Sequence, residues 1–187
     1  MYKLPVFYAT TDGHTRRIAE TIAATLREVG FQSEACELSR KMPRPNWINI
    51  RSAVIGASVH VGKHQRAAAE FIAREAEHLN VRPAAFFSVS LTAASTNPAK
   101  RDLIHGLAAN FVRGAGWQPG RITCFAGKLA YTKYGFIKRF LMRRISAVEG
   151  GPTDTTRDHD LTDWSAVREF ALLVAAEAQS EHTSLAS

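Results

Sequence analysis

Residues 6–15 read Val-Phe-Tyr-Ala-Thr-Thr-Asp-Gly-His-Thr. The first four complete a largely apolar run, Lys3–Ala9, of the kind that forms a buried strand. A helical pattern follows over Thr15–Val29, where apolar residues recur on one stripe until Gly30 ends it. A short polar turn therefore joins a buried strand directly to the N-terminus of a helix.

The turn from Thr10 to Thr15 has the composition of an anion site. A phosphate there would meet free backbone N–H groups and the positive end of a helix dipole, equivalent to about half a charge. Three threonine hydroxyls can donate further hydrogen bonds, and Gly13 lets the backbone close around the anion. A helix N-cap with a turn glycine would account for the same residues without any ligand.

The rest of the chain alternates short apolar runs with longer amphipathic ones. We expect strands at Gln32–Leu38, 53–56, 84–89 and 122–126, and helices at 64–79, 98–113 and 164–178. Such alternation predicts an α/β fold with a doubly wound, five-stranded parallel sheet in the order 2-1-3-4-5. One domain over 1–179 and a flexible tail at 180–187 are expected. The stretch 128–161 is too long for an ordinary connection and is predicted to be an insertion after strand 5.

Composition narrows the functional class. The chain has 24 Lys+Arg against 17 Asp+Glu, a formal net charge of +7. A basic surface suits nucleic acid, anionic lipid or an anionic substrate, and does not suit an acidic electron shuttle. No apolar run approaches the roughly 20 residues that span a bilayer, and no signal peptide is evident. Two cysteines without a motif favour a reduced, cytoplasmic protein.

The segment 6–15, continued by Ala19 and Ile22, resembles the flavodoxin signature. It matches neither the Gly-x-Gly-x-x-Gly dinucleotide fingerprint nor a Walker loop. Further segments make the chain similar to the menaquinone-dependent protoporphyrinogen IX dehydrogenase family over nearly its whole length, including an insertion that ordinary flavodoxins lack. They are Gly56-Ala57-Ser58, Gly62-Lys63-His64, Phe86–Leu91, Trp117-Gln118-Pro119, Ala126–Tyr131, Gly150–Thr155 and Thr162-Asp163-Trp164.

This resemblance implies a flavodoxin-like fold, bound FMN, and oxidation of protoporphyrinogen IX to protoporphyrin IX in haem biosynthesis, with a menaquinone-type acceptor. The flavin carries the chemistry, so no catalytic side chain and no metal are expected. The implied partners are a porphyrinogen, a membrane quinone and the cytoplasmic face of the inner membrane, and the chain could form an oligomer. The residues expected to bind FMN are Thr10, Thr11, Asp12, Gly13, His14, Thr15, Ser58, Val59, His60, Val61, Gly62, Ser90, Leu91, Thr92, Ala93, Gly127 and Tyr131.

Four places depart from the family pattern. Thr11 replaces an arginine, His14 a glutamine, His60-Val61 an arginine-tyrosine pair, and Ser90 an asparagine that is frequent there. All of them fall in the expected flavin loops, where they could retune the flavin potential or the choice of substrate. The threonine-rich phosphate turn is unaffected.

The insertion is strongly basic, and its apolar residues recur at helical spacing over 136–145. Three interpretations remain open for this amphipathic helix: a solvated helix packed on strand 5, an interfacial helix on anionic lipid, or a substrate flap whose cations meet propionates. The residues expected to contact substrate or membrane are Lys133, Lys138, Arg139, Arg143 and Arg144.

Other features of the sequence bear on alternative functions. His60 and His64 have the spacing of a metal pair, but no carboxylate or cysteine completes a site. Nucleic-acid binding lacks a recognition helix or a stacking platform. An electron-carrier flavodoxin and a quinone reductase fed by nicotinamide remain the alternative functions.

Overall fold

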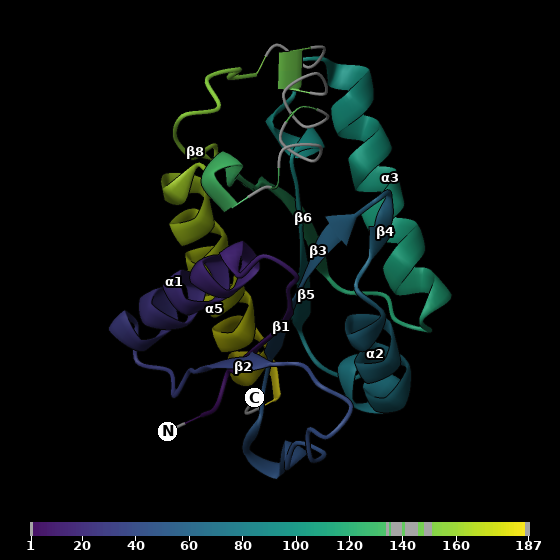
Figure 1. Cartoon of the computed structure of the whole chain (residues 1–187). Coiled ribbons are helices and arrows are strands. Elements are labelled where there is room, and N and C mark those ends of the chain that lie inside the picture. The colour runs from purple at the N-terminus through teal and green to yellow at the C-terminus, as the bar shows by residue number, and fades with distance from the viewer. Residues whose placement is uncertain (1, 134, 136–139, 141–145, 148–150, 186–187) are drawn as a thin grey trace.

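The computed structural model describes residues 2–133, 135, 140, 146–147 and 151–185. Its central sheet has the order β2-β1-β3-β5-β6, and all four neighbouring pairs are parallel (Figure 1). The strands are β1 (Val6–Ala9), β2 (Ala35–Glu37), β3 (Ala53–His60), β5 (Ala84–Ser90) and β6 (Arg121–Ala126). This is the predicted 2-1-3-4-5 order of five parallel strands. A sixth strand, β4 (Lys63–His64), pairs antiparallel with the end of β3 and was not predicted.

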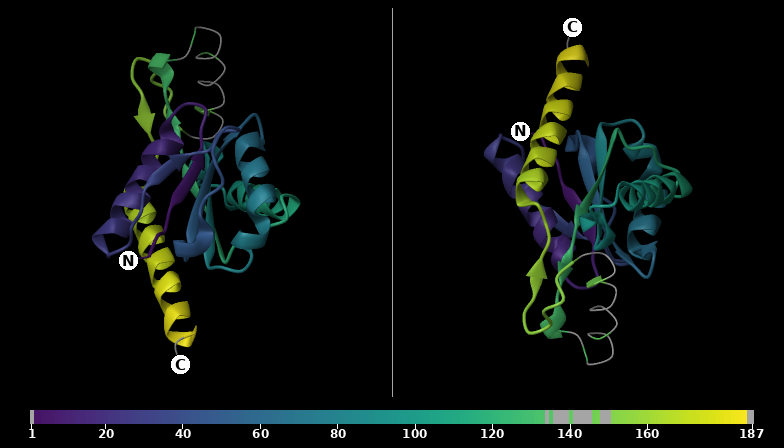
Figure 2. Two further views of the ribbon diagram at one scale, coloured as in Figure 1. Left: turned by 90° about the horizontal axis from the view of Figure 1, so that it is seen from below. Right: turned by 90° about the horizontal axis from the view of Figure 1, so that it is seen from above.

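Helices cover both faces of the sheet, which gives the three layers seen in Figure 2. On one face, α1 (His14–Glu28) and α5 (Trp164–Leu185) bury their apolar stripes against Val6, Val54 and Phe87. On the other, α2 (Arg66–Leu79) and α3 (Pro98–Gly114) pack against Phe7, Ile55 and Phe86. The buried β3 and β5 therefore read as continuous apolar runs, as expected for a parallel sheet covered on both sides.

The centre of the sheet is packed tightly at Gly56. A Cβ built on Gly56 would collide with the ring of Phe87, which is fully buried on the neighbouring strand. We expect Gly56→Ala to lower the free energy of unfolding by about 3 kcal/mol, because the ring must move within a close-packed interior. Gly106→Ala is the matched control, since open space surrounds Gly106 on α3. It should be neutral or stabilising by up to about 1 kcal/mol. Equal stability of both variants in urea unfolding would contradict this packing argument.

The region after β6 contains a small sheet that was not predicted. In this region β7 (Lys128–Leu129) and β8 (His159–Asp160) form a two-stranded antiparallel sheet. The short helix η3 (Tyr131–Lys133) comes directly after β7 in the chain. Of the helix predicted over 136–145, only residue 140 is among the described residues, so the structure does not test that helix. No helix in the described part of the chain is long and apolar enough to span a membrane. The division into one domain over 1–179 with an insertion at 128–161 remains a proposal.

Candidate functional site

The phosphate turn lies at the carboxyl end of β1. Gly13 occupies the N-cap of α1 with φ of 82°, in the left-handed region that favours glycine. The Gly13 N–H donates to Thr10 Oγ1 over 3.0 Å, which closes the turn. Among the described residues, no side chain caps α1, and the first turn of this helix contains no acidic residue. The first N–H groups of α1 therefore lack the usual side-chain acceptor and suit an anion.

The predicted turn residues differ in accessibility. Thr11 and Asp12 are exposed, Thr10 and Gly13 are half-buried, and Thr15 is buried. Gln65, at the N-cap of α2, donates from Nε2 to Thr11 Oγ1 and, over 3.1 Å, to Ser58 Oγ. It thereby connects the phosphate turn with the end of β3. Gln65 was not predicted from the sequence, because only the fold brings it to the other two residues.

The second predicted loop is the hairpin between β3 and β4. Its turn consists of Val61 and Gly62, with φ of 49° and 71°. A β-branched residue rarely adopts positive φ, so Val61 is held in a strained conformation. Its side chain is 87% exposed, and His60 is exposed beside it. The structure thus places His60–Gly62 at an exposed tip, with Ser58 and Val59 half-buried below it.

His64 anchors the hairpin to the sheet. Its Nε2 lies 2.8 Å from Ser88 Oγ, and its ring stacks on Phe111 at a centroid distance of 4.4 Å. Burial lowers the pKa of His64 to about 4. His64 is therefore neutral at neutral pH and acts as a packing residue below the hairpin.

This low pKa has a consequence for stability. Below the ordinary histidine pKa of about 6.5, His64 is protonated in the unfolded chain but stays neutral in the folded protein. The contribution of neutral His64 to the free energy of unfolding is complete above about pH 6.5 and is lost as the pH falls toward 4. We expect the free energy of unfolding between pH 7.5 and 5 to fall by on the order of 1 kcal/mol more in the parent than in His64→Phe, which keeps the stacking. Urea unfolding at both pH values measures it, and parallel pH profiles would refute it.

The third predicted loop and Gly127 lie together at the ends of β5 and β6. Ser90 Oγ accepts from Ala93 N over 3.2 Å, which fixes the short helix η2 (Thr92–Ala94). The Ser90 carbonyl accepts from Gly127 N over 3.1 Å. Ser90 and Gly127 are buried, whereas Leu91, Thr92 and Ala93 are half-buried. The ends of β1, β3, β5 and β6 thus gather most of the predicted flavin residues at one edge, where ligands of this fold bind.

Tyr131 is placed differently from the other predicted residues. It is 0% exposed, and its hydroxyl donates to the Pro152 carbonyl over 3.0 Å. Its predicted contact with FMN stays a prediction. Beside it, Asp158 accepts hydrogen bonds from Thr132 and pairs with Lys128 over 3.0 Å. These hydrogen bonds lower the pKa of Asp158 to about 2, so the carboxylate stays charged.

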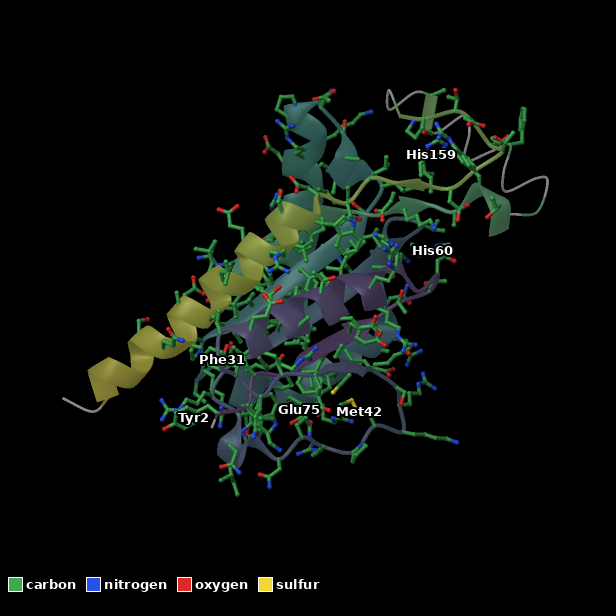
Figure 3. The ribbon with its side chains drawn as sticks, turned by 90° about the vertical axis from the view of Figure 1, so that its left-hand side faces the viewer. Tyr2, Phe31, Met42, His60, Glu75 and His159 are labelled. Atoms are coloured by element: carbon green, nitrogen blue, oxygen red, sulfur yellow. The ribbon has the colours of Figure 1, made fainter. Side chains whose placement is uncertain are left out.

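The five cations predicted to contact substrate or membrane cannot be placed. The side chain of Lys133 and all of Lys138, Arg139, Arg143 and Arg144 lie outside the described residues. In Figure 3, His60 and His159 point to one end of the molecule, and Tyr2, Met42 and Glu75 lie toward the other. A cavity of about 510 Å³ opens near Met42, lined by residues of β1, β2 and the loop after β2. It contains none of the residues predicted to bind FMN.

His14 begins α1, but its side chain is buried against the segment after β8. Its Nε2 lies 2.6 Å from Thr162 Oγ1, and its ring meets the edge of Trp164. These partners were missed, because they lie far from His14 in the sequence.

Comparison with known proteins identifies similar families and folds. A family model described as a flavodoxin domain matches residues 5–156. A protein from Escherichia coli named protoporphyrinogen IX dehydrogenase [quinone] is 37% identical over 92% of this chain and 94% of its own length. A protein of the same name from Leishmania major is 34% identical over 93% of this chain and 75% of its own. Oxidised flavodoxin 1 from Bacillus cereus superposes with a TM-score of 0.54 at 15% identity, covering 93% and 97% of the two chains, which shows the fold alone.

Proposed function

This chain belongs to the flavodoxin-domain family, and we propose that it is an FMN-dependent oxidoreductase that converts protoporphyrinogen IX to protoporphyrin IX with a quinone as acceptor. The observation that carries the proposal is the 37% identity to the Escherichia coli protein of that name over 92% of this chain. A match of this extent includes most of the region 128–161. It supports the reaction as well as the fold.

The family and the fold indicate a flavin, and the chemistry of the turn favours FMN. Uncapped N–H groups of α1, the left-handed Gly13 and the threonine hydroxyls form a donor set that suits a terminal phosphate. The hairpin at 58–62 and the loop at 90–93 would flank the ring system, and Gly127 would let the backbone approach it. Bound FMN would supply two-electron chemistry, accepting from the porphyrinogen and delivering to the quinone.

The protein's own contribution is positioning. Gln65 fixes Thr11 relative to Ser58, Ser90 fixes η2 and Gly127, and His64 fixes the hairpin. We assign no side chain as a catalytic acid or base. Complete oxidation removes six electrons and six protons from each porphyrinogen, so three quinones must become three quinols.

This stoichiometry tests the proposed reaction. Purified FMN-loaded protein, mixed without oxygen with protoporphyrinogen IX and limiting quinone, should form one porphyrin for each three quinones consumed. Porphyrin fluorescence and quinone absorbance measure the two quantities. Porphyrin formation at a rate independent of quinone would contradict the proposal.

We propose that the basic insertion serves both substrates. Its cations suit the two propionates of the porphyrinogen and the headgroups of anionic lipids, near which a membrane quinone is found. Each basic residue close to such a surface could contribute on the order of 1 kcal/mol. This would place the protein on the cytoplasmic face of the inner membrane.

Vesicle binding tests this part of the proposal. We expect the protein to sediment with vesicles rich in anionic lipid at low salt and to dissociate as salt screens the charges. Changing Lys138, Arg139, Arg143 and Arg144 to glutamine should abolish the binding. The matched control removes the same charge from four exposed residues elsewhere, Arg16, Arg40, Lys41 and Arg113. Equal loss in both variants would show that only the net charge matters and would remove the role of the insertion.

A further inference from the structure

His14 joins two parts of the candidate site that are far apart in the chain. Its backbone follows Gly13 in the phosphate turn and begins α1. Its N–H is therefore one of the first four of the helix, which have no carbonyl partner within the helix. Its imidazole is 91% buried and contacts Thr162, which follows β8 at the end of the insertion. One residue thus has its main chain in the phosphate turn and its side chain on the returning arm, residues 159–162.

The direction of these hydrogen bonds follows from the hydroxyl of Thr162. That hydroxyl donates its single proton to the Ala126 carbonyl over 2.8 Å. It must therefore accept from His14, so Nε2 carries the imidazole proton. A directed chain runs from His14 through Thr162 to the last residue of β6. Beside it, the Leu161 N–H donates to the Gly127 carbonyl over 3.2 Å.

Burial and two nearby cations favour a neutral His14 ring. Burial lowers its pKa most; Asp160 raises it, and Arg17 and Lys128 lower it. Asp160 Oδ1 lies 3.6 Å from His14 Nε2 and accepts from Thr162 N, while its other oxygen pairs with Arg17. Within the described part of the chain, His14 Nδ1 has no hydrogen-bond partner. Among the described residues, the hydrogen bond of Nε2 to Thr162 is therefore the one that orients the ring.

We propose that His14 is a positioning residue that couples the phosphate turn to the returning arm, so that binding of the FMN phosphate also fixes Gly127 against the flavin. The inference rests on the proposed function. A phosphate held by the N–H groups of α1 fixes the main chain of His14. Because the ring is enclosed, fixing the main chain also fixes the hydrogen bond to Thr162, and through Leu161 and Ala126 the position of Gly127.

Hydrogen exchange tests the coupling directly. FMN should slow exchange of the Leu161 amide at least fivefold in the parent protein. The effect should survive in His14→Gln, whose side-chain amide can still donate to Thr162, and in Thr162→Ser, which keeps the hydroxyl. It should be lost in His14→Ala and Thr162→Val, and FMN affinity should fall about tenfold in each. Both variants remove the bond between His14 and Thr162, and Thr162→Val also removes the bond to the Ala126 carbonyl. The double variant should therefore be no worse than Thr162→Val alone.

The outcomes separate this inference from the proposed function. A parent protein that does not bind FMN would overturn both. FMN protection of Leu161 that persists in FMN-loaded His14→Ala or Thr162→Val would overturn the coupling alone. A purely structural role of His14 would lower the stability of the free protein and leave the FMN-dependent protection intact. If His14→Ala does not fold, Thr162→Val breaks the same bond from the other side and gives the decisive comparison.

Discussion

Replacing Thr10 and Thr15 together with valine is expected to weaken FMN binding about a hundredfold. Each hydroxyl is expected to donate to the phosphate, at about 1 kcal/mol or more for a bond to a charged group. The pair then accounts for roughly 2–3 kcal/mol, or two orders of magnitude in Kd. Thr10 has a second role, because its Oγ1 accepts from Gly13 N and holds the turn closed. Titration of the free protein with FMN, followed by quenching of flavin fluorescence, measures the effect.

Two controls make this result specific to the phosphate. Thr21→Val removes a hydroxyl on α1 that donates to the Arg17 carbonyl within the same helix, and it should leave FMN affinity unchanged. Riboflavin lacks the phosphate, so its affinity should be nearly equal in the parent and the double variant. FMN binding as tight as in the parent would place the phosphate elsewhere. An equal loss for riboflavin would indicate general damage to the site.

The second large effect is expected from the insertion. Replacing residues 134–145 with a short Gly-Ser link should leave FMN bound, because the phosphate turn is untouched. It also spares the hydrogen bonds of Thr132 to Asp158 and of Ser146 to Pro152. Porphyrinogen turnover should fall at least a hundredfold. Covering about 200 Å² of the apolar tetrapyrrole is worth roughly 5 kcal/mol, before ordering costs reduce it.

The assay compares FMN occupancy with the growth of porphyrin fluorescence. A control truncation that removes 181–187 shortens α5 at the end away from the phosphate turn and should change neither quantity. Unchanged turnover in a folded, FMN-loaded loop variant would exclude a substrate wall formed by residues 134–145. It would favour a simple electron carrier, which needs only an exposed flavin edge.

The strand order could be predicted because alternating strands and helices permit few right-handed arrangements. The ends of elements were less accurate, for physical reasons. The first strand was predicted from Lys3, but β1 begins at Val6. Pro5 has no N–H to donate to the ladder, and Lys3 forms only isolated bridges with Gln32 and Ile50. At the other end, α5 continues to Leu185, past the predicted end at Ala178, because its polar residues still permit a helix.

Some parts of the candidate site could likewise be predicted from the sequence, and others could not. The phosphate turn is contiguous in sequence, so its composition revealed it. The contact between His14 and Thr162 spans 148 positions, and Gln65 lies 54 positions from Thr11. No local pattern encodes such pairs. Strands as short as β7 and β8 leave no periodicity, and nothing in the sequence distinguishes a buried Tyr131 from one facing a ligand.

The most direct test of the proposed reaction is anaerobic stopped-flow mixing of oxidised, FMN-loaded protein with protoporphyrinogen IX in the absence of quinone. We expect the absorbance of oxidised flavin to disappear at least as fast as steady-state turnover. Three flavins should be bleached for each porphyrin that forms, and added quinone should restore the oxidised spectrum. The proposed function is contradicted if the flavin stays oxidised with porphyrinogen while dithionite still reduces it normally.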